Sequence, residues 1–137
     1  MAIVKKQTPG ATSNKKKKYP KLTAGLLHIK TSSNNTIVAL TDADGNLVIG
    51  AGAGRVGFKG TKKSSAYAAE QAAKFVLNEA KTNCGLKEVG VICKGVGLGR
   101  DGVFKAINEL GGIDIKYIEE ATPLRFGGTK GKRPKRN

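Results

Sequence analysis

Residues 88–111 (EVGVICKGVGLGRDGVFKAINELG) combine three local patterns that together restrict the possible folds more than any other stretch. Apolar β-branched residues from Val89 to Ile92 predict a buried strand. A glycine-rich turn follows, and apolar residues at helical spacing from Val103 to Leu110 predict a helix. A buried strand that leads through a short turn into a helix is typical of an α/β domain.

The glycine-rich turn is also a candidate phosphate site. Its three glycines permit backbone conformations that a side chain would forbid, and they are Gly95, Gly97 and Gly99. Lys94 and Arg100 flank them, and Asp101 is the expected N-cap of the following helix. Free amide groups at a helix start, next to two fixed cations, suit a phosphate group.

The distribution of charge indicates a polyanionic partner. The chain of 137 residues has a formal net charge of +15 at pH 7. Residues 1–41 hold eight Lys and no acid, residues 42–120 hold eleven basic and ten acidic residues, and residues 121–137 hold six basic residues and no acid. Such basic segments favour nucleic acid. An anionic membrane is the alternative partner, but no long amphipathic basic helix is apparent to bind it.

Composition divides the chain into a body and two tails. We expect a basic N-terminal arm over residues 1–21, a single α/β domain over 22–120 and a basic C-terminal tail over 121–137. Both tails should be disordered until an anionic partner binds them. The run Lys15–Lys18 is either a solvated solubility segment or a binding arm, and the equally basic opposite terminus favours the arm.

The first half of the body predicts an antiparallel meander. Strands are expected over residues 22–31, over 36–41 and from Leu47 onward, and short turns join them. Asp44-Gly45 is typical of a hairpin turn, and the segment lacks the glycine and glutamate positions of a calcium loop.

The second half of the body predicts two helices and two strands. A helix capped by Ser64 or Ser65 should reach about Asn83, with Gly85 as a left-handed cap. Its alanines form the expected buried face, and Glu70 and Lys74 form an i, i+4 pair on the expected exposed side. With a last strand near residues 113–118, the body is a three-stranded meander followed by α-β-α-β, in a mixed sheet with helices packed on it.

The acid-free loop 55–65 is a second candidate anion site. Its cations are Arg55, Lys59, Lys62 and Lys63. Phe58 either stacks on a base or, as we prefer, anchors the loop to the core.

The chain offers little for catalysis. Residues 97–102 match the GxGxxG dinucleotide fingerprint, but only one βαβ unit follows the meander, so we expect no dinucleotide cofactor. The single histidine, His28, lies within a strand, and no nucleophile–base pair is apparent. Asp42 and Asp44 share a hairpin while the other acids are scattered, which argues against a metal-dependent nuclease. We therefore expect no enzymatic activity and no cofactor.

The remaining sequence signals concern metals, membranes and the kind of nucleic acid. Cys84 and Cys93 lack companion ligands at zinc spacing and should be free thiols, so we expect no metal. No apolar run is long enough to cross a bilayer, and no secretion signal or clean amphipathic transit helix is expected at the N-terminus. Three Tyr and four Phe provide few stacking platforms, which favours folded RNA over splayed single strands.

Several motifs in order resemble one family. They are Asn34-Asn35-Thr36-Ile37-Val38 with Thr41-Asp42 and Gly45-Asn46, GFKGTKKS at 57–64, KGVGLGRDG at 94–102, and Ala121-Thr122-Pro123 before a basic tail. Over about residues 24–137 the chain resembles the small-subunit ribosomal protein S-eleven family in its bacterial or organellar form. It departs from the family pattern at Val96 and Leu98, where prolines are usual, and at residues 124–128 of the tail.

The resemblance implies a ribonuclease-H-like core without nuclease activity. It implies a structural constituent of the small ribosomal subunit, in a bacterial cytoplasm or organelle matrix, that bridges rRNA helices on the platform beside the messenger exit cleft. Implied neighbours are ribosomal proteins S-seven and S-eighteen, and S-six or S-twenty-one. The alternatives from other classes are a nuclease or resolvase on the same core and a free-standing RNA-binding regulator.

The family pattern and the charge pattern together give a set of expected rRNA contacts. They are Lys15, Lys16, Lys17, Lys18, Asn34, Asn35, Arg55, Lys59, Lys62, Lys63, Ser64, Lys94, Gly95, Gly97, Gly99, Arg100, Arg125, Lys130, Lys132, Arg133, Lys135 and Arg136.

Overall fold

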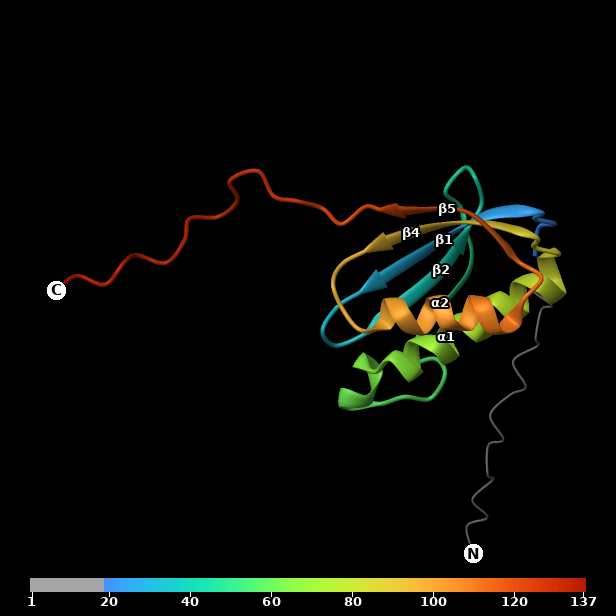
Figure 1. Cartoon of the computed structure of the whole chain (residues 1–137), viewed down its shortest axis with the longest axis horizontal. Helices are drawn as coiled ribbons and strands as arrows, with labels where there is room; N and C mark the ends of the chain where they lie inside the picture. Colours follow the sequence, from blue (N-terminus) through green and yellow to red (C-terminus); the bar gives the residue numbers. More distant parts are fainter. Residues whose placement is uncertain (1–18) are drawn as a thin grey trace, which may run out of the picture.

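Five strands form one mixed sheet in the computed structural model, which describes residues 19–137 (Figure 1). In chain order the elements are β1 (Ala24–Thr31), β2 (Thr36–Thr41), β3 (Leu47–Gly52), the 3-10 helix η1 (Gly60–Ser64), α1 (Ala66–Glu79), the π-helical turn η2 (Ala80–Cys84), β4 (Glu88–Lys94), α2 (Gly99–Leu110) and β5 (Asp114–Glu120). The N-terminal Lys15–Lys18 lie outside the described residues.

The strand order in the sheet is β3-β2-β1-β4-β5. β1, β2 and β3 pair antiparallel, whereas β4 is parallel to β1 and β5 is parallel to β4. The hairpin turn at 42–46 is closed by a hydrogen bond of 3.0 Å from the Gly45 amide to the Asp42 carbonyl. The predicted meander, the α-β-α-β continuation and the mixed sheet are therefore confirmed.

Both helices cover the same face of the sheet (Figure 1). Alternate strand residues point into this layer, so that Leu27, Ile29, Val38 and Leu40 are fully buried. The alanines of α1 that belong to this core are Ala69 and Ala73, and both are fully buried. These small side chains allow a close approach of helix and strands, as the sequence predicts.

The ends of α1 match the sequence prediction. Ser65 is its N-cap, and the Ser65 hydroxyl accepts a hydrogen bond of 3.2 Å from the amide of Ala68. The helical path continues through η2 to Cys84, where Gly85 takes the left-handed conformation with φ of 72°.

The predicted start of α2 is wrong. The helix begins at Gly99 with Leu98 in the N-cap position and without a side-chain cap, so Asp101 lies within the first turn. An acidic side chain is still favourable in the first turn, because its negative charge is attracted to the positive end of the helix dipole.

The predicted exposure of Glu70 is also wrong. Its i, i+4 pair with Lys74 forms, but Glu70 is only 6% exposed. α2 packs across this side of α1, and Gly102 permits a close approach because a Cβ there would overlap the carbonyl of Ala66. The second helix therefore buries a position that helical spacing alone assigns to solvent.

An irregularity between β4 and β5 explains why the apolar spacing of the last strand breaks. Val89 is paired with Ile115, whereas the next residue, Gly90, is paired with Tyr117. One extra residue on β5 turns Tyr117 over Gly90 and leaves Ile118 59% exposed.

The chain after β5 is attached to the body for two residues and then extends away from it (Figure 1). The Ala121 amide donates a hydrogen bond of 2.8 Å to the Cys93 carbonyl. Residues 123–137 form no helix or strand and are exposed. Over residues 19–137, no helix has the length and apolar character needed to span a membrane.

Candidate nucleic-acid interface

Three loops without acidic residues meet at one end of the sheet (Figure 1). They are the β1–β2 turn (32–35), the loop with η1 (53–65) and the β4–α2 turn (95–98). β1 and β4 are adjacent and parallel, so the turns that follow them leave the sheet at the same edge. The topology thus gathers segments that are about 60 residues apart in the sequence.

Two open hollows lie between these loops. The first, of about 420 Å³, is lined by Asn34, Asn35, Gly60, Thr61, Lys63 and Ser64. The second, of about 350 Å³, is lined by Ser32, Ser33, Ser64, Val96, Gly97 and Leu98. Ser64 borders both hollows. Five of the residues expected to contact RNA, from three separate loops, therefore line one continuous surface.

Hydrogen bonds within the β1–β2 turn hold its two asparagines. The Ser32 hydroxyl accepts from the Asn34 amide at 3.4 Å and from the Asn35 amide at 3.2 Å. The Asn35 side-chain oxygen accepts from the Thr36 amide at 2.8 Å. Among the hydrogen bonds of the described residues, none uses the exposed side-chain amide of Asn34, so this group is available to a ligand.

The glycines of the β4–α2 turn serve close packing. Gly95 has φ of +86°, and a Cβ there would overlap the carbonyl oxygen of Thr31. An added side chain at Gly97 would meet Ser32 of the β1–β2 turn, and one at Gly99 would meet Thr36 at the start of β2. The Gly95 amide donates to the Thr122 hydroxyl at 3.1 Å, so this amide is already used within the protein. The GxGxxG match thus has a packing explanation that needs no dinucleotide.

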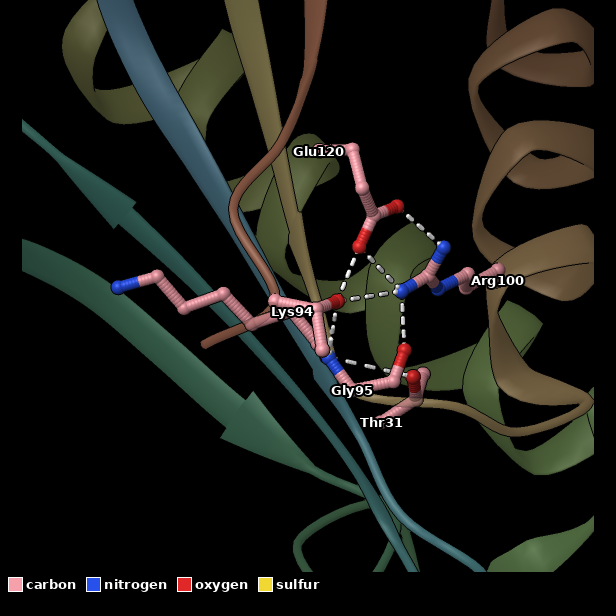
Figure 2. Close-up of polar contacts among 6 residues, drawn as sticks. Thr31, Lys94, Gly95, Arg100 and Glu120 are labelled. Carbon is pink, nitrogen blue, oxygen red and sulfur yellow. Dashed lines mark hydrogen bonds and ion pairs between the residues drawn. The ribbon is translucent and has the colours of Figure 1, made fainter. Parts of the chain in front are cut away.

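The two cations of this turn point to different sides. Figure 2 shows the Lys94 ammonium directed away from the Arg100 guanidinium. Arg100 binds Glu120 through both carboxylate oxygens, with Nη1–Oε2 of 2.5 Å and Nη2–Oε1 of 2.9 Å. It also donates to the Gly95 carbonyl oxygen and, at 3.2 Å, to the Thr122 hydroxyl. The sequence predicts that Lys94 and Arg100 surround one phosphate site, whereas in the structure their charged groups point away from each other.

The contact with Arg100 holds the pKa of the Glu120 carboxyl below its ordinary value, and the Thr122 hydroxyl contributes to the same shift. The same ion pair raises the pKa of Arg100. Both groups therefore stay charged at neutral pH, and the arginine's charge is offset by a carboxylate from a distant strand.

The open face of the sheet carries a cation that the sequence-based set omits. Lys30 on β1 is directly paired with Lys94 on β4, and both side chains are exposed. Burial, followed by repulsion from Lys94, lowers the pKa of nearby His28, whose Nε2 lies 3.0 Å from the Thr41 hydroxyl oxygen. The alternation of β1 was the available signal, because Lys30 follows buried Ile29 and must face the opposite side.

The loop 53–65 contains both engaged and available cations. Arg55 donates to the Gly50 carbonyl at 2.7 Å and stacks over the Phe75 ring at 4.9 Å, which ties it to the body. Phe58 packs edge-on against Tyr67 of α1 at 5.8 Å, but Tyr67 is 61% exposed, so this contact lies outside the core to which the loop is expected to be anchored. The lysines of this loop form none of the ion pairs found in residues 19–137, and they are Lys59, Lys62 and Lys63.

The six C-terminal cations are all exposed. They are Arg125, Lys130, Lys132, Arg133, Lys135 and Arg136. The tail leaves the body at the end where the three loops meet (Figure 1). It therefore adds six positive charges to that end of the molecule.

The described residues contain no group of three or more His, Cys, Asp or Glu side chains placed to hold a metal ion. Cys84 and Cys93 are free and buried. Burial raises the pKa of both thiols, which keeps them protonated and unreactive at neutral pH.

Comparison with known proteins gives a consistent result. The family model described as Ribosomal protein S11 matches residues 25–137. Small ribosomal subunit protein uS11 of Thermotoga maritima is 42% identical over 124 residues, which cover 90% of this chain and 94% of that protein. The protein of the same name from Chlamydia pneumoniae is 40% identical over 134 residues, which cover 98% of this chain and 99% of that protein. The one from Campylobacter jejuni is 42% identical over 106 residues, which cover 77% of this chain and 81% of that protein. The chain therefore belongs to the ribosomal protein S11 family, a family of structural proteins of the small ribosomal subunit rather than of enzymes.

Proposed function

We propose that this protein is a structural constituent of the small ribosomal subunit that binds and bridges rRNA helices during translation. The observation that carries the proposal is the meeting of three acid-free loops and a tail of six cations at one end of the sheet. Cations that neutralise phosphates release counterions, which favours binding to RNA without any base readout. Two loops that are held rigidly against each other would then set the orientation of the bound helices.

We further propose that the core is a ribonuclease-H-like scaffold used for binding. The strand order β3-β2-β1-β4-β5, with an antiparallel meander and two parallel strands, supports this proposal. The scaffold would serve to bring the turns after β1 and β4 to one edge. The family resemblance supports a location on the platform beside the messenger exit cleft, with ribosomal proteins S-seven and S-eighteen, and S-six or S-twenty-one, as neighbours.

The proposed contacts divide into three groups. The body would contribute Asn34, Asn35, Lys59, Lys62, Lys63, Ser64, Lys94 and the backbone at Gly97, whereas Gly99 is buried against Thr36 and would support the turn without touching RNA. The tails would contribute Lys15–Lys18 and the six C-terminal cations. Arg55 and Gly95 would act at the rim, because parts of each are already engaged with the protein.

Binding to small-subunit rRNA, measured across a range of salt concentrations, tests this function. The double variant Lys59→Gln/Lys62→Gln should weaken binding and reduce the slope of log affinity against log salt by about 0.7 to 0.9 for each lost contact. The matched control is Lys21→Gln/Lys87→Gln, which removes the same charge from exposed positions beside the starts of β1 and β4. An equal loss of affinity in both double variants would show that only the total charge of the protein matters, which would contradict a localised interface. Failure of the wild-type protein to co-sediment with small subunits would contradict the ribosomal role and favour a free-standing regulator.

A further inference from the structure

We propose that Arg100 is a positioning residue that fixes the point and direction in which the basic tail leaves the body, and that it is not a phosphate ligand. This inference rests on the proposed RNA-binding function. It concerns the group formed by Gly95, Arg100, Glu120 and Thr122, which we call the clasp. Figure 2 labels three of its members, Gly95, Arg100 and Glu120.

The guanidinium of Arg100 has its strongest donors already occupied. Its two Nη atoms bind the two oxygens of Glu120, and Nη2 also reaches the Gly95 carbonyl oxygen and the Thr122 hydroxyl. Bidentate pairing of this kind is the geometry in which Arg holds a carboxylate most firmly. The Arg100 side chain is 27% exposed, and a phosphate would have to displace Glu120 to be bound in the same way.

The clasp joins three segments at the base of the tail. Arg100 belongs to the first turn of α2, Gly95 to the β4–α2 turn, and Glu120 is the last residue of β5. Thr122 closes the arrangement, because its hydroxyl accepts from the Gly95 amide and donates to Glu120. The Ala121 amide is bound to the Cys93 carbonyl between these two points. The chain is thus held through Thr122, and the tail begins at the next residue.

The electrostatics of the helix start also favour a structural role. A positive side chain in the first turn of a helix opposes the helix dipole, so an isolated Arg100 would be unfavourable there. The Glu120 carboxylate offsets this charge at 2.5 Å.

The consequence for binding is preorganisation. Six cations lie within residues 123–137, and their effective concentration near a bound RNA depends on where the tail starts. When the start of the tail is fixed beside the three loops, the tail loses less conformational entropy on binding RNA. Opening the clasp would release β5 at its end and let the tail leave in many directions.

The two roles of Arg100 predict opposite effects of Glu120→Gln. If Arg100 binds phosphate, removing the competing carboxylate frees it and strengthens RNA binding. If Arg100 positions the tail, Glu120→Gln opens the clasp and weakens binding as Arg100→Gln does. Glu119→Gln is the matched control, because it removes the same charge from the neighbouring residue of β5, which forms none of the ion pairs seen in the described residues.

The experiment measures the affinity of the full chain for small-subunit rRNA in these three variants, each also combined with a tail whose six cations are replaced by Gln. We expect Arg100→Gln and Glu120→Gln each to weaken binding about three- to tenfold, through lost preorganisation, while Glu119→Gln does not weaken it. Both losses should disappear in the neutral-tail background. Amide hydrogen exchange should speed up at Gly95 and Ala121 but not at core residue Val91.

Three results would overturn the inference: stronger binding by Glu120→Gln, no loss in either clasp variant, or losses of full size in the neutral-tail background. If Arg100→Gln does not fold, Glu120→Gln with its control decides alone. Failure of the wild-type chain to bind the rRNA would instead contradict the proposed function.

Discussion

The carboxylate Oε1 of Glu70 lies 2.6 Å from the Nζ of Lys74, one helical turn further along α1, at the side that α2 covers. The other oxygen, Oε2, lies 3.3 Å from the Nζ of Lys105 on α2. Lys74 in turn binds Glu109 of α2 at 2.5 Å. Two acids and two lysines therefore join the helices across their interface, in addition to the apolar contacts beneath them.

We predict that Glu70→Gln lowers the melting temperature more than Lys105→Gln does, because Glu70 is the most buried member of this network. Its hydrogen bond with Lys74 lowers the pKa of Glu70 below the ordinary value of 4.5. A depressed folded-state pKa contributes stability above pH 4.5, and this contribution is lost as the pH falls through the folded-state value. The difference in melting temperature between wild type and Glu70→Gln should therefore be largest near pH 7 and shrink towards pH 3. A constant difference across this range would contradict the prediction.

Gly95→Ala should destabilise the fold much more than Gly45→Ala. The two glycines have nearly the same φ, +86° and +87°, so the backbone penalty of about 1 kcal/mol is common to both. At Gly45 a new Cβ meets no atom within 4 Å, whereas at Gly95 it overlaps the Thr31 carbonyl. We expect a total loss of about 3 kcal/mol at Gly95 in urea unfolding, because the two turns must separate. Equal losses would mean that the turns are not in contact.

Ala73→Leu should reduce the free energy of unfolding by about 1 to 3 kcal/mol, because a larger side chain would force α1 away from the sheet. Ala73 is fully buried in the helix–sheet layer. The control is Asn78→Leu on the exposed side of α1, where we expect a change within about 0.5 kcal/mol. Chemical denaturation of both variants measures the difference, and a neutral Ala73→Leu would show that the layer has spare volume.

Lys30→Gln should weaken binding to small-subunit rRNA and reduce the salt slope by about 0.7 to 0.9, as Lys94→Gln should, if the open face beside the turns contributes to the interface. Lys116→Gln is the control, because Lys116 is paired with Glu88 at 2.9 Å and has its charge offset within the protein. A slope that is unchanged by Lys30→Gln would restrict the interface to the loops and the tail.

Removal of residues 124–137 should reduce the salt slope by up to about 5, since as many as six phosphate contacts would be lost. The cut leaves Ala121 and Thr122 in place, and their hydrogen bonds to β4 and the β4–α2 turn are preserved. An unchanged slope would show that the tail does not contact RNA.

The antiparallel meander and the α-β-α-β continuation could be predicted from the sequence, because each element has its own apolar pattern and short turns leave few ways to connect the first three strands. The burial of Glu70 and the place of Asp101 within the first turn of α2 could not be predicted in this way. Spacing along one helix gives the direction of each side chain but does not reveal which side a second helix covers, and α2 covers Glu70. Gly99, where α2 begins, lies against Thr36, which is 63 residues earlier in the chain and cannot be identified as its neighbour from local sequence.

The candidate interface could be predicted as a set of residues but not as an arrangement. Charge and glycine content identify the segment 55–65 and the glycine-rich turn after residue 94 as separate candidates. Their meeting at the β1–β2 turn follows from the parallel pairing of β1 with β4, which is a tertiary property. The pairing of Arg100 with Glu120 has the same origin, since the two residues are brought together only when β5 lies beside β4.

Surface turns ordinarily accept insertions and deletions readily. The turns after β1 and β4 should not, because Gly95 lies against the backbone of Thr31 with no room for even one additional carbon. A change of length in either turn would have to be matched by the other, so the two should vary together in length across the family while the hairpin at 42–46 varies freely.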